Sequence, residues 1–105
     1  MVFLNDENFK LYLQQESALM VYFSADWCGS RKAVAPIVDQ IDREKLPGIQ
    51  IGKLDVDRSS ATAEFFSIRS IPTFLFFKEG MLIDKLVGPA NKALLEGKLG
   101  ELHAI

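Results

Sequence analysis

Residues 18–23 form a nearly unbroken run of apolar side chains that favour strands. Such a run, without the alternation of a half-exposed strand, indicates a strand buried on both faces in the centre of a sheet. Residues 49–56 alternate between apolar and polar side chains and predict a second core strand. Residues 73–77, Thr-Phe-Leu-Phe-Phe, predict a third strand.

Four other segments are expected to be helical, because capping residues precede them or apolar residues recur along them at helical spacing. The capping residues are Asn5 or Asp6, Ser59 or Ser60, and Asn91, and the apolar positions include Phe9, Leu11, Tyr12, Leu13, Val34, Ile37, Val38, Ile41, Leu94, Leu95, Leu99 and Leu102. The short third segment is expected over 61–66. Pro36 is expected to kink the second helix, and Pro47-Gly48 to end it.

Glu79-Gly80 lies between two apolar segments, a pattern that predicts a β-hairpin. The chain thus alternates strand and helix, then ends with a hairpin and a closing helix. This order predicts an α/β fold, with a mixed central sheet covered by helices on both faces. The aromatic clusters at 65–66 and 74–77 are expected in its core.

The chain has 105 residues, which suits a single domain over 1–105. A formal net charge of -2 gives no electrostatic reason to expect nucleic acid or an anionic membrane as a partner. No apolar stretch approaches the ~20 residues of a membrane span, and the first residues do not resemble a signal peptide. We therefore expect a cytoplasmic monomer.

Cys28 is the only cysteine of the chain and lies in the segment Trp27-Cys28-Gly29-Ser30-Arg31. A single cysteine cannot form a disulfide within its own chain, so nothing requires an oxidising compartment. Cys28 precedes a predicted helix, whose unpaired N–H groups and dipole favour the reactive thiolate. Arg31, one turn further on, either adds a favourable charge or is a solvated helix residue.

Six motifs occur in a familiar order over nearly the whole chain. They are Trp27-Cys28-Gly29, Ala35-Pro36, Lys53-Leu54-Asp55-Val56-Asp57, Ile71-Pro72-Thr73, Phe77-Lys78-Glu79-Gly80 and Val87-Gly88. Together they resemble the thioredoxin family. The resemblance implies the thioredoxin fold, with the redox cysteine at the start of a kinked helix. It also implies a cis peptide bond before Pro72, which faces Cys28.

The resemblance further implies a groove that offers backbone groups to an extended substrate, a form of strand addition. The residues expected to form this groove are Trp27, Gly29, Ser30, Ile71, Pro72 and Gly88. Three positions depart from the family pattern. Arg31 replaces the second cysteine of the dithiol pair, Ser30 replaces the proline between the cysteines, and Tyr22 replaces a buried acid. Lys53 matches the usual lysine neighbour of that acid.

These departures predict a monothiol oxidoreductase in which Cys28 and Arg31 are the catalytic residues. Cys28 would attack a protein disulfide and form a mixed disulfide. Release would come from the substrate's second thiol or from glutathione. Recycling through a thioredoxin reductase is disfavoured, since no internal disulfide can accept electrons.

Two other functions stay open. The groove around Trp27 and Pro72 could belong to a non-catalytic protein-binding module. Iron–sulfur binding, as in single-cysteine glutaredoxins, is a weaker alternative, because those proteins carry Cys-Gly-Phe-Ser where this chain has Cys-Gly-Ser-Arg. We expect no metal or other cofactor: His103 is the only histidine, and Asp55 and Asp57 are expected to be solvated.

Overall fold

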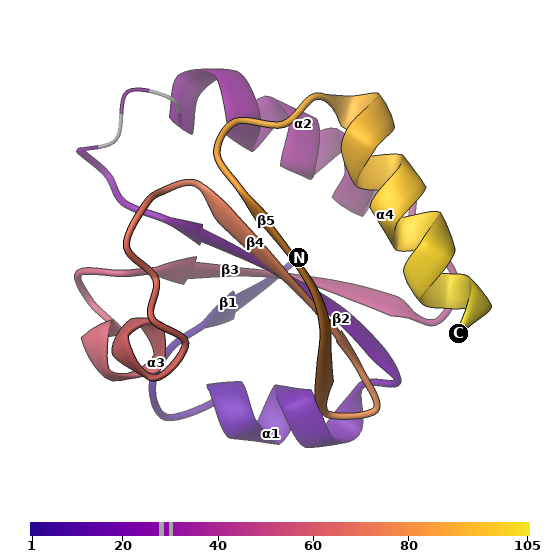
Figure 1. Cartoon of the computed structure of the whole chain (residues 1–105), viewed down its shortest axis with the longest axis horizontal. Coiled ribbons are helices and arrows are strands. Elements are labelled where there is room, and N and C mark those ends of the chain that lie inside the picture. Colours follow the sequence, from indigo (N-terminus) through magenta and orange to yellow (C-terminus); the bar gives the residue numbers. More distant parts are fainter. Residues whose placement is uncertain (28, 30) are drawn as a thin grey trace.

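The computed structural model describes residues 1–27, 29 and 31–105, and for Arg31 it describes the backbone only. In chain order the elements are β1 (Val2–Leu4), α1 (Phe9–Gln15), β2 (Ala18–Ser24), α2 (Arg31–Arg43), β3 (Ile49–Asp55), α3 (Ser60–Phe65), β4 (Thr73–Lys78), β5 (Met81–Val87) and α4 (Lys92–Ala104). The strands form one five-stranded sheet in the order β1-β3-β2-β4-β5 (Figure 1).

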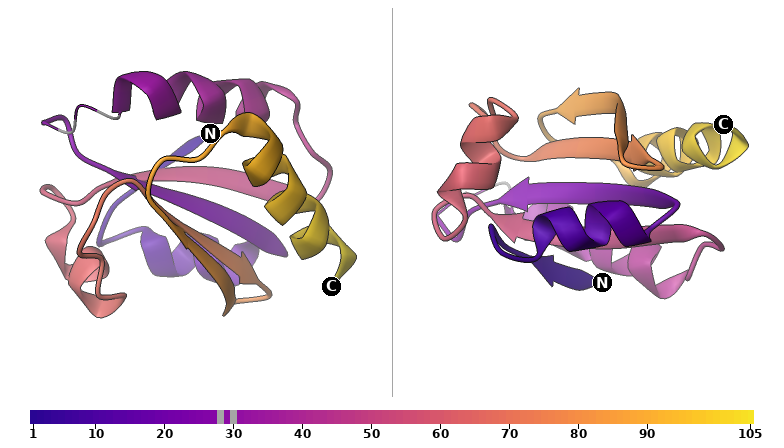
Figure 2. Two further views of the ribbon diagram at one scale, coloured as in Figure 1. Left: turned by 45° about the horizontal axis from the view of Figure 1, so that its top comes forward. Right: turned by 90° about the horizontal axis from the view of Figure 1, so that it is seen from below.

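The apolar run predicted to be central is β2, and all seven of its residues are buried. It pairs in parallel with β3 and antiparallel with β4, so the sheet is mixed. β3 also pairs in parallel with β1, and β4 pairs antiparallel with β5. Helices lie on both faces of the sheet, as Figure 1 and the left panel of Figure 2 show. The predicted α/β class and mixed sheet are therefore confirmed.

The two faces of the sheet have separate cores, because successive residues of a strand point to opposite sides. The first, called here the α2/α4 face, buries alternate residues of β2 and β4 under α2 and α4. Its largest members are Met20, Tyr22, Ile41, Phe74, Phe76, Leu95, Leu99 and Leu102. The second, called the α1/α3 face, buries the intervening residues. Its members are Leu4, Phe9, Leu19, Val21, Phe23, Leu54, Leu75 and Phe77.

The β4–β5 hairpin has the predicted turn. Glu79 and Gly80 both have positive φ, 49° and 82°. Two successive residues in this conformation match the twist of a tight hairpin. The register of the hairpin shifts between Phe76 and Phe77, which marks a bulge near the start of β5, close to the turn.

Helix starts differ from the sequence-based expectation in two places. The Asn5 side chain accepts the backbone N–H groups of Glu7 and Asn8, at 2.9 and 2.8 Å, so it organises the turn before α1 instead of capping the helix. Ser59 precedes α3 without a side-chain capping bond. The carboxylate of Asp6 reaches α3 instead, and accepts the backbone N–H of Thr62 at 2.8 Å. Asn91 caps α4 as predicted, accepting the N–H of Leu94 at 2.8 Å.

Two further expectations need correction, and one strand was missed. α2 ends at Arg43, before Pro47-Gly48, and the chain then turns through Lys45 with φ of 49°. Leu94 and Leu11 were placed on apolar stripes, but their side chains are 43% and 51% exposed. The strand β1 was not predicted at all, because three residues are too few to show a strand pattern.

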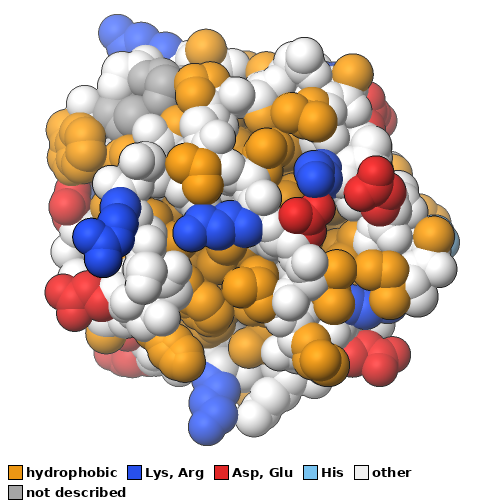
Figure 3. Space-filling model, in the orientation of Figure 1, with side chains coloured by type: hydrophobic (Ala, Val, Ile, Leu, Met, Phe, Trp, Pro, Cys, Tyr) orange, Lys and Arg blue, Asp and Glu red, His pale blue; other side chains and the backbone are white. Residues whose placement is uncertain are grey.

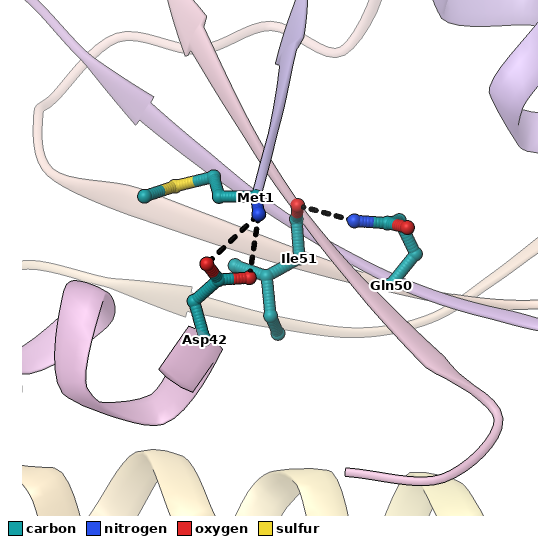
Figure 4. Close-up of polar contacts among 4 residues, drawn as sticks. All are labelled: Met1, Asp42, Gln50 and Ile51. Atoms are coloured by element: carbon teal, nitrogen blue, oxygen red, sulfur yellow. Dashed lines mark hydrogen bonds and ion pairs between the residues drawn. The ribbon is translucent and has the colours of Figure 1, made fainter. Parts of the chain in front are cut away.

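β1 is joined to α2 by an ion pair between the amino group of Met1 and Asp42 (Figure 4). The amino nitrogen lies 2.7 Å from Oδ1 and 2.8 Å from Oδ2 of Asp42. Nearby, the Gln50 side chain donates to the carbonyl of Ile51 at 3.0 Å. None of the described helices has the length and apolar character needed to cross a membrane.

Candidate functional site

Four segments converge at one end of the sheet, and three of them carry predicted site residues. The register pairs Ser24 of β2 with Asp55 of β3, and Phe23 of β2 with Thr73 of β4. Thr73 in turn pairs with Val87 of β5. The chain therefore leaves β2 towards Trp27, leaves β3 towards Asp57, enters β4 from Pro72 and leaves β5 at Gly88, all at this end. Figure 1 shows it at the left, beside the start of α2.

Trp27 is held at the protein surface by a hydrogen bond. Its indole N–H donates to Oδ2 of Asp57 at 2.7 Å, while its side chain stays 69% exposed. Asp57 is itself fixed by a tight turn, in which Oδ1 of Asp55 accepts the backbone N–H groups of Asp57 and Arg58 at 2.9 and 3.1 Å. The turn aims the Asp57 carboxylate at the indole. An indole that is both anchored and exposed presents its apolar ring to solvent, where a partner can contact it.

Sequence reasoning expected Asp55 and Asp57 to be merely solvated and therefore missed this role. Two acids at alternate positions after a strand, followed by polar residues, are also the signal of an Asx turn. That local signal was available. The link to Trp27 was not, because 30 residues separate the two partners.

Pro72 lies opposite Gly88 at the start of the hairpin. The peptide bond between Ile71 and Pro72 is cis. The backbone N–H of Gly88 donates to the Pro72 carbonyl at 2.8 Å, and Gly88 has φ of 97°, where glycine is favoured. The Thr73 hydroxyl donates to the carbonyl of Ser70. Pro72 is buried and Ile71 half-buried, so these bonds hold the loop against the sheet.

The family model described as Thioredoxin matches residues 1–101. The chain belongs to the thioredoxin family.

Three relatives illustrate the similarity. The chain is 40% identical over 97 residues to "Thioredoxin M-type, chloroplastic" of Pisum sativum, covering 91% of this chain and 56% of that protein. It is 38% identical over 90 residues to "Thioredoxin" of Mycobacterium tuberculosis (strain ATCC 25618 / H37Rv), covering 86% and 78%. It is 38% identical over 97 residues to "Thioredoxin" of Synechocystis sp., covering 91% of each. The chain thus spans little more than half the length of the pea protein. Its own single-domain organisation over 1–105 stays a prediction.

The position where thioredoxins are expected to carry a buried acid has an aromatic environment here. Tyr22 is 1% exposed in the centre of the sheet. Its ring stacks on that of Phe74 with centroids 5.3 Å apart and planes at 14°. Tyr22 is paired in register with Lys53 on β3. The site therefore keeps the lysine position of the thioredoxin pattern and fills the neighbouring acid position with a buried, stacked tyrosine ring.

Cys28 and Ser30 lie outside the described residues, as does the side chain of Arg31. The expectations that Cys28 faces Pro72 and that Arg31 approaches the sulfur therefore stay predictions. Gly29 is exposed, and an added Cβ there would meet nothing within 4 Å. Arg31 is the first residue of α2. Among the described residues no group of three or more histidine, cysteine or acidic side chains could hold a metal ion.

Proposed function

We propose that this thioredoxin-family chain is a monothiol thiol–disulfide oxidoreductase, which acts on protein disulfides or mixed disulfides through Cys28. The main support is the arrangement of the residues next to Cys28 in the sequence and of the loop around Pro72. Trp27, immediately before Cys28, is anchored and exposed through Asp57. Pro72 and Gly88 are tied together at the same end of the sheet. These features suit a substrate strand that passes the thiol.

In the proposed reaction the Cys28 thiolate attacks one sulfur of a substrate disulfide. A bond forms between that sulfur and Cys28, and the other substrate sulfur leaves as a thiolate. If a second substrate thiolate attacks the mixed disulfide, Cys28 is released and the substrate disulfide has been rearranged without net oxidation. If glutathione attacks the Cys28 sulfur, the substrate leaves reduced. A second glutathione then frees Cys28 and forms oxidised glutathione.

The remaining predicted residues have supporting roles in this proposal. Backbone groups around Ile71 and Pro72 would pair with the extended substrate, and Gly29 and Ser30 would contact it next to the thiol. Arg31 would stabilise the thiolate together with the N–H groups of the first turn of α2. We further propose that the protein works as a monomer in the cytoplasm, although two of the matched relatives are named as chloroplastic.

The decisive test uses a peptide glutathionylated at its one cysteine, with reduced glutathione as the thiol. The wild-type protein should release the peptide thiol catalytically, and Cys28→Ser should not. The same protein should barely reduce insulin when a thioredoxin reductase and NADPH supply the electrons. Arg31→Cys should recover part of that insulin reduction, because it restores a dithiol while Tyr22 remains. No difference between wild type and Cys28→Ser would refute the proposal.

The role of Arg31 is tested by the pH dependence of Cys28 alkylation. Helix-end effects of about 0.3–1 kcal/mol, at about 1.36 kcal/mol per pH unit, should by themselves lower the midpoint by less than about one unit from about 8.5, and Arg31 should lower it by a similar further amount. Arg31→Ala should move the midpoint back upwards. Coincident midpoints would make Arg31 a bystander.

A protein-binding module is the second candidate. The stacked, buried Tyr22 favours it, because the site has no acid at that position to move a proton. In this case Cys28→Ser should retain the partner and Trp27→Ala should lose it. An alkylation midpoint near about 8.5 together with no release of glutathione would favour this reading.

A further inference from the structure

A groove on the α1/α3 face has no part in the thiol chemistry. It has a volume of about 540 Å³ and lies between α1, α3 and the β4–β5 hairpin. Three packed aromatic rings contribute to its lining. The ring centroid of Phe9 lies 5.5 Å from that of Phe66 and 5.8 Å from that of Phe77. Figure 3 faces this region and shows hydrophobic side chains gathered in a hollow, with lysine or arginine side chains above and below it.

The rim of the groove is also apolar, and it is exposed. Phe65 on α3 is 73% exposed, and Leu82 on β5 is 46% exposed. Phe65 was predicted to be a core residue, and that prediction is wrong, because the six-residue α3 presents it outwards. A large aromatic side chain left in water beside an aromatic hollow can bury further area when a ligand binds.

Hydrogen bonds hold the elements that border the groove. The N–H of Glu79 in the hairpin turn donates to the carbonyl of Ser17, which follows α1, at 2.8 Å. Asp6 accepts the hydroxyl of Thr62, near the start of α3, at 2.7 Å. The volume of the groove, about 540 Å³, falls in the range of small-molecule sites, which favours a compact ligand.

The charge that remains available at the groove is positive. Only two lining residues are charged, Asp6 and Lys10. The Asp6 carboxylate is committed to α3, where it accepts from the Thr62 hydroxyl and from the backbone N–H groups of Thr62 and Ala61. These bonds hold the pKa of Asp6 below its usual value. In the part of the chain that the structure describes, the side chain of Lys10 forms no hydrogen bond or ion pair, so its ammonium can meet an anion.

We propose that this groove binds a small apolar carboxylate, with its hydrocarbon part on Phe9, Phe65 and Phe66 and its carboxylate at Lys10. Apolar contact supplies most of the affinity, and the lysine selects the anionic head. The site is separate from Trp27 and Pro72, so it does not depend on the proposed thiol chemistry.

The test is a titration of the ¹⁵N-labelled full chain with octanoate, followed by amide NMR. Saturable shifts are expected at Leu13, Thr62 and Phe66, with none at Trp27 or Gly88. 1-Octanol should bind more weakly, and octyltrimethylammonium more weakly still, because the groove offers a cation. Shifts confined to the Trp27 end would overturn the proposal, as would equal binding of the anionic and cationic octyl compounds.

Two variants with matched controls sharpen the result. Phe65→Ala should weaken octanoate binding by about fivefold to tenfold. Phe3→Ala is the control, because Phe3 is equally exposed, at 73%, but lies on β1 outside the groove. Lys10→Gln should weaken octanoate by about two- to fivefold and leave 1-octanol unchanged. Equal effects of Phe65→Ala and Phe3→Ala, or no effect of Lys10→Gln, would contradict the proposed site. Tighter binding of an acidic apolar peptide than of octanoate would also overturn it.

Discussion

The two faces of the sheet are covered to different extents. α2 and α4 have 13 residues each, whereas α1 has 7 and α3 has 6. A helix rises about 1.5 Å per residue, so the short pair covers roughly half the length of the long pair. The hollows described on the α2/α4 face are smaller, at about 260 and 200 Å³. The α1/α3 face leaves an apolar groove beside the hairpin, and the difference shows how helix length decides where a sheet can meet a ligand.

On each face, one polar contact also links two elements. On the α2/α4 face, Lys98 of α4 donates to Oδ2 of Asp84 on β5 at 2.8 Å. On the α1/α3 face, Asp6 before α1 holds the start of α3 through Thr62. The Lys98–Asp84 contact is an ion pair at the surface, whereas the Asp6 carboxylate accepts hydrogen bonds from neutral donors. They should therefore respond differently to pH and to salt.

The largest effect is expected when a fully buried side chain on the α2/α4 face is shortened. Leu99 is 0% exposed on the α2/α4 face. Leu99→Ala should lower the free energy of unfolding in urea by about 2–5 kcal/mol, because it removes buried methyl groups and leaves a cavity. Leu94→Ala is the control in the same helix, where the side chain is 43% exposed. It should cost about 1 kcal/mol or less.

The same truncation beside the groove should cost less. Leu13 is half-buried and lines the groove. Leu13→Ala should lower the free energy of unfolding by about 1–2 kcal/mol, since part of this side chain already contacts solvent. Equal costs for Leu13→Ala and Leu99→Ala in urea denaturation would show that both faces are equally closed, and would break the comparison.

The hydrogen bonds between the Asp6 carboxylate and Thr62 should weaken in acid. The hydrogen bonds from Thr62 hold the pKa of Asp6 below its usual value of 3.8, so the contact stabilises the fold fully above that value. This stability is lost as the pH falls through the lower pKa of the folded state. Asp6→Asn keeps an acceptor oxygen but does not titrate. The difference in melting temperature between wild type and Asp6→Asn should therefore shrink as the pH falls from 5 to about 2.5.

The control for that experiment is Asp39→Asn, an exposed position on α2. Its difference from the wild type should change much less over the same range. If the Asp6→Asn difference stays constant with pH, the carboxylate does not cap α3 in solution.

The smallest effect is expected for the ion pair on the other face. Hydrogen bonding with Lys98 lowers the pKa of Asp84, and the same bond raises the pKa of Lys98. The pair therefore loses its contribution as the pH falls below the pKa of Asp84 or rises through that of Lys98. Both side chains are partly exposed, at 36% and 26%. A double-mutant cycle with Asp84→Asn and Lys98→Met should give a small favourable coupling, the smallest of the effects predicted here, because solvent screens an exposed pair. The coupling should fall in 1 M salt, and a salt-independent value would contradict a surface ion pair.

Local signals were enough to predict much of the fold. The buried β2, the Glu79-Gly80 turn and the Asn91 cap each depend on residues within a few positions of one another, and all three occur as expected. The motifs around Trp27 and Pro72 also identified segments that the register brings to one end of the sheet. Helix and strand propensity, helix capping and turn formation each depend on residues that are close together in the chain, so they can be predicted directly from the sequence.

Only the tertiary structure decided the contacts between distant segments. Asp6 was expected to start α1 but caps α3, 56 residues away at Thr62. Asp57 was expected to be solvated but anchors Trp27. Phe65 was expected in the core because its side chain is large and apolar, but it lies at the rim of a groove. In each case the contacts of the side chain depend on how two elements pack together. A side chain forms hydrogen bonds and apolar contacts with the groups that lie next to it in space, and these come from distant parts of the chain. The amino-acid sequence by itself determined most of the helices and strands and the place of the single thiol in the chain. How these elements pack against one another determined the partners of the three side chains.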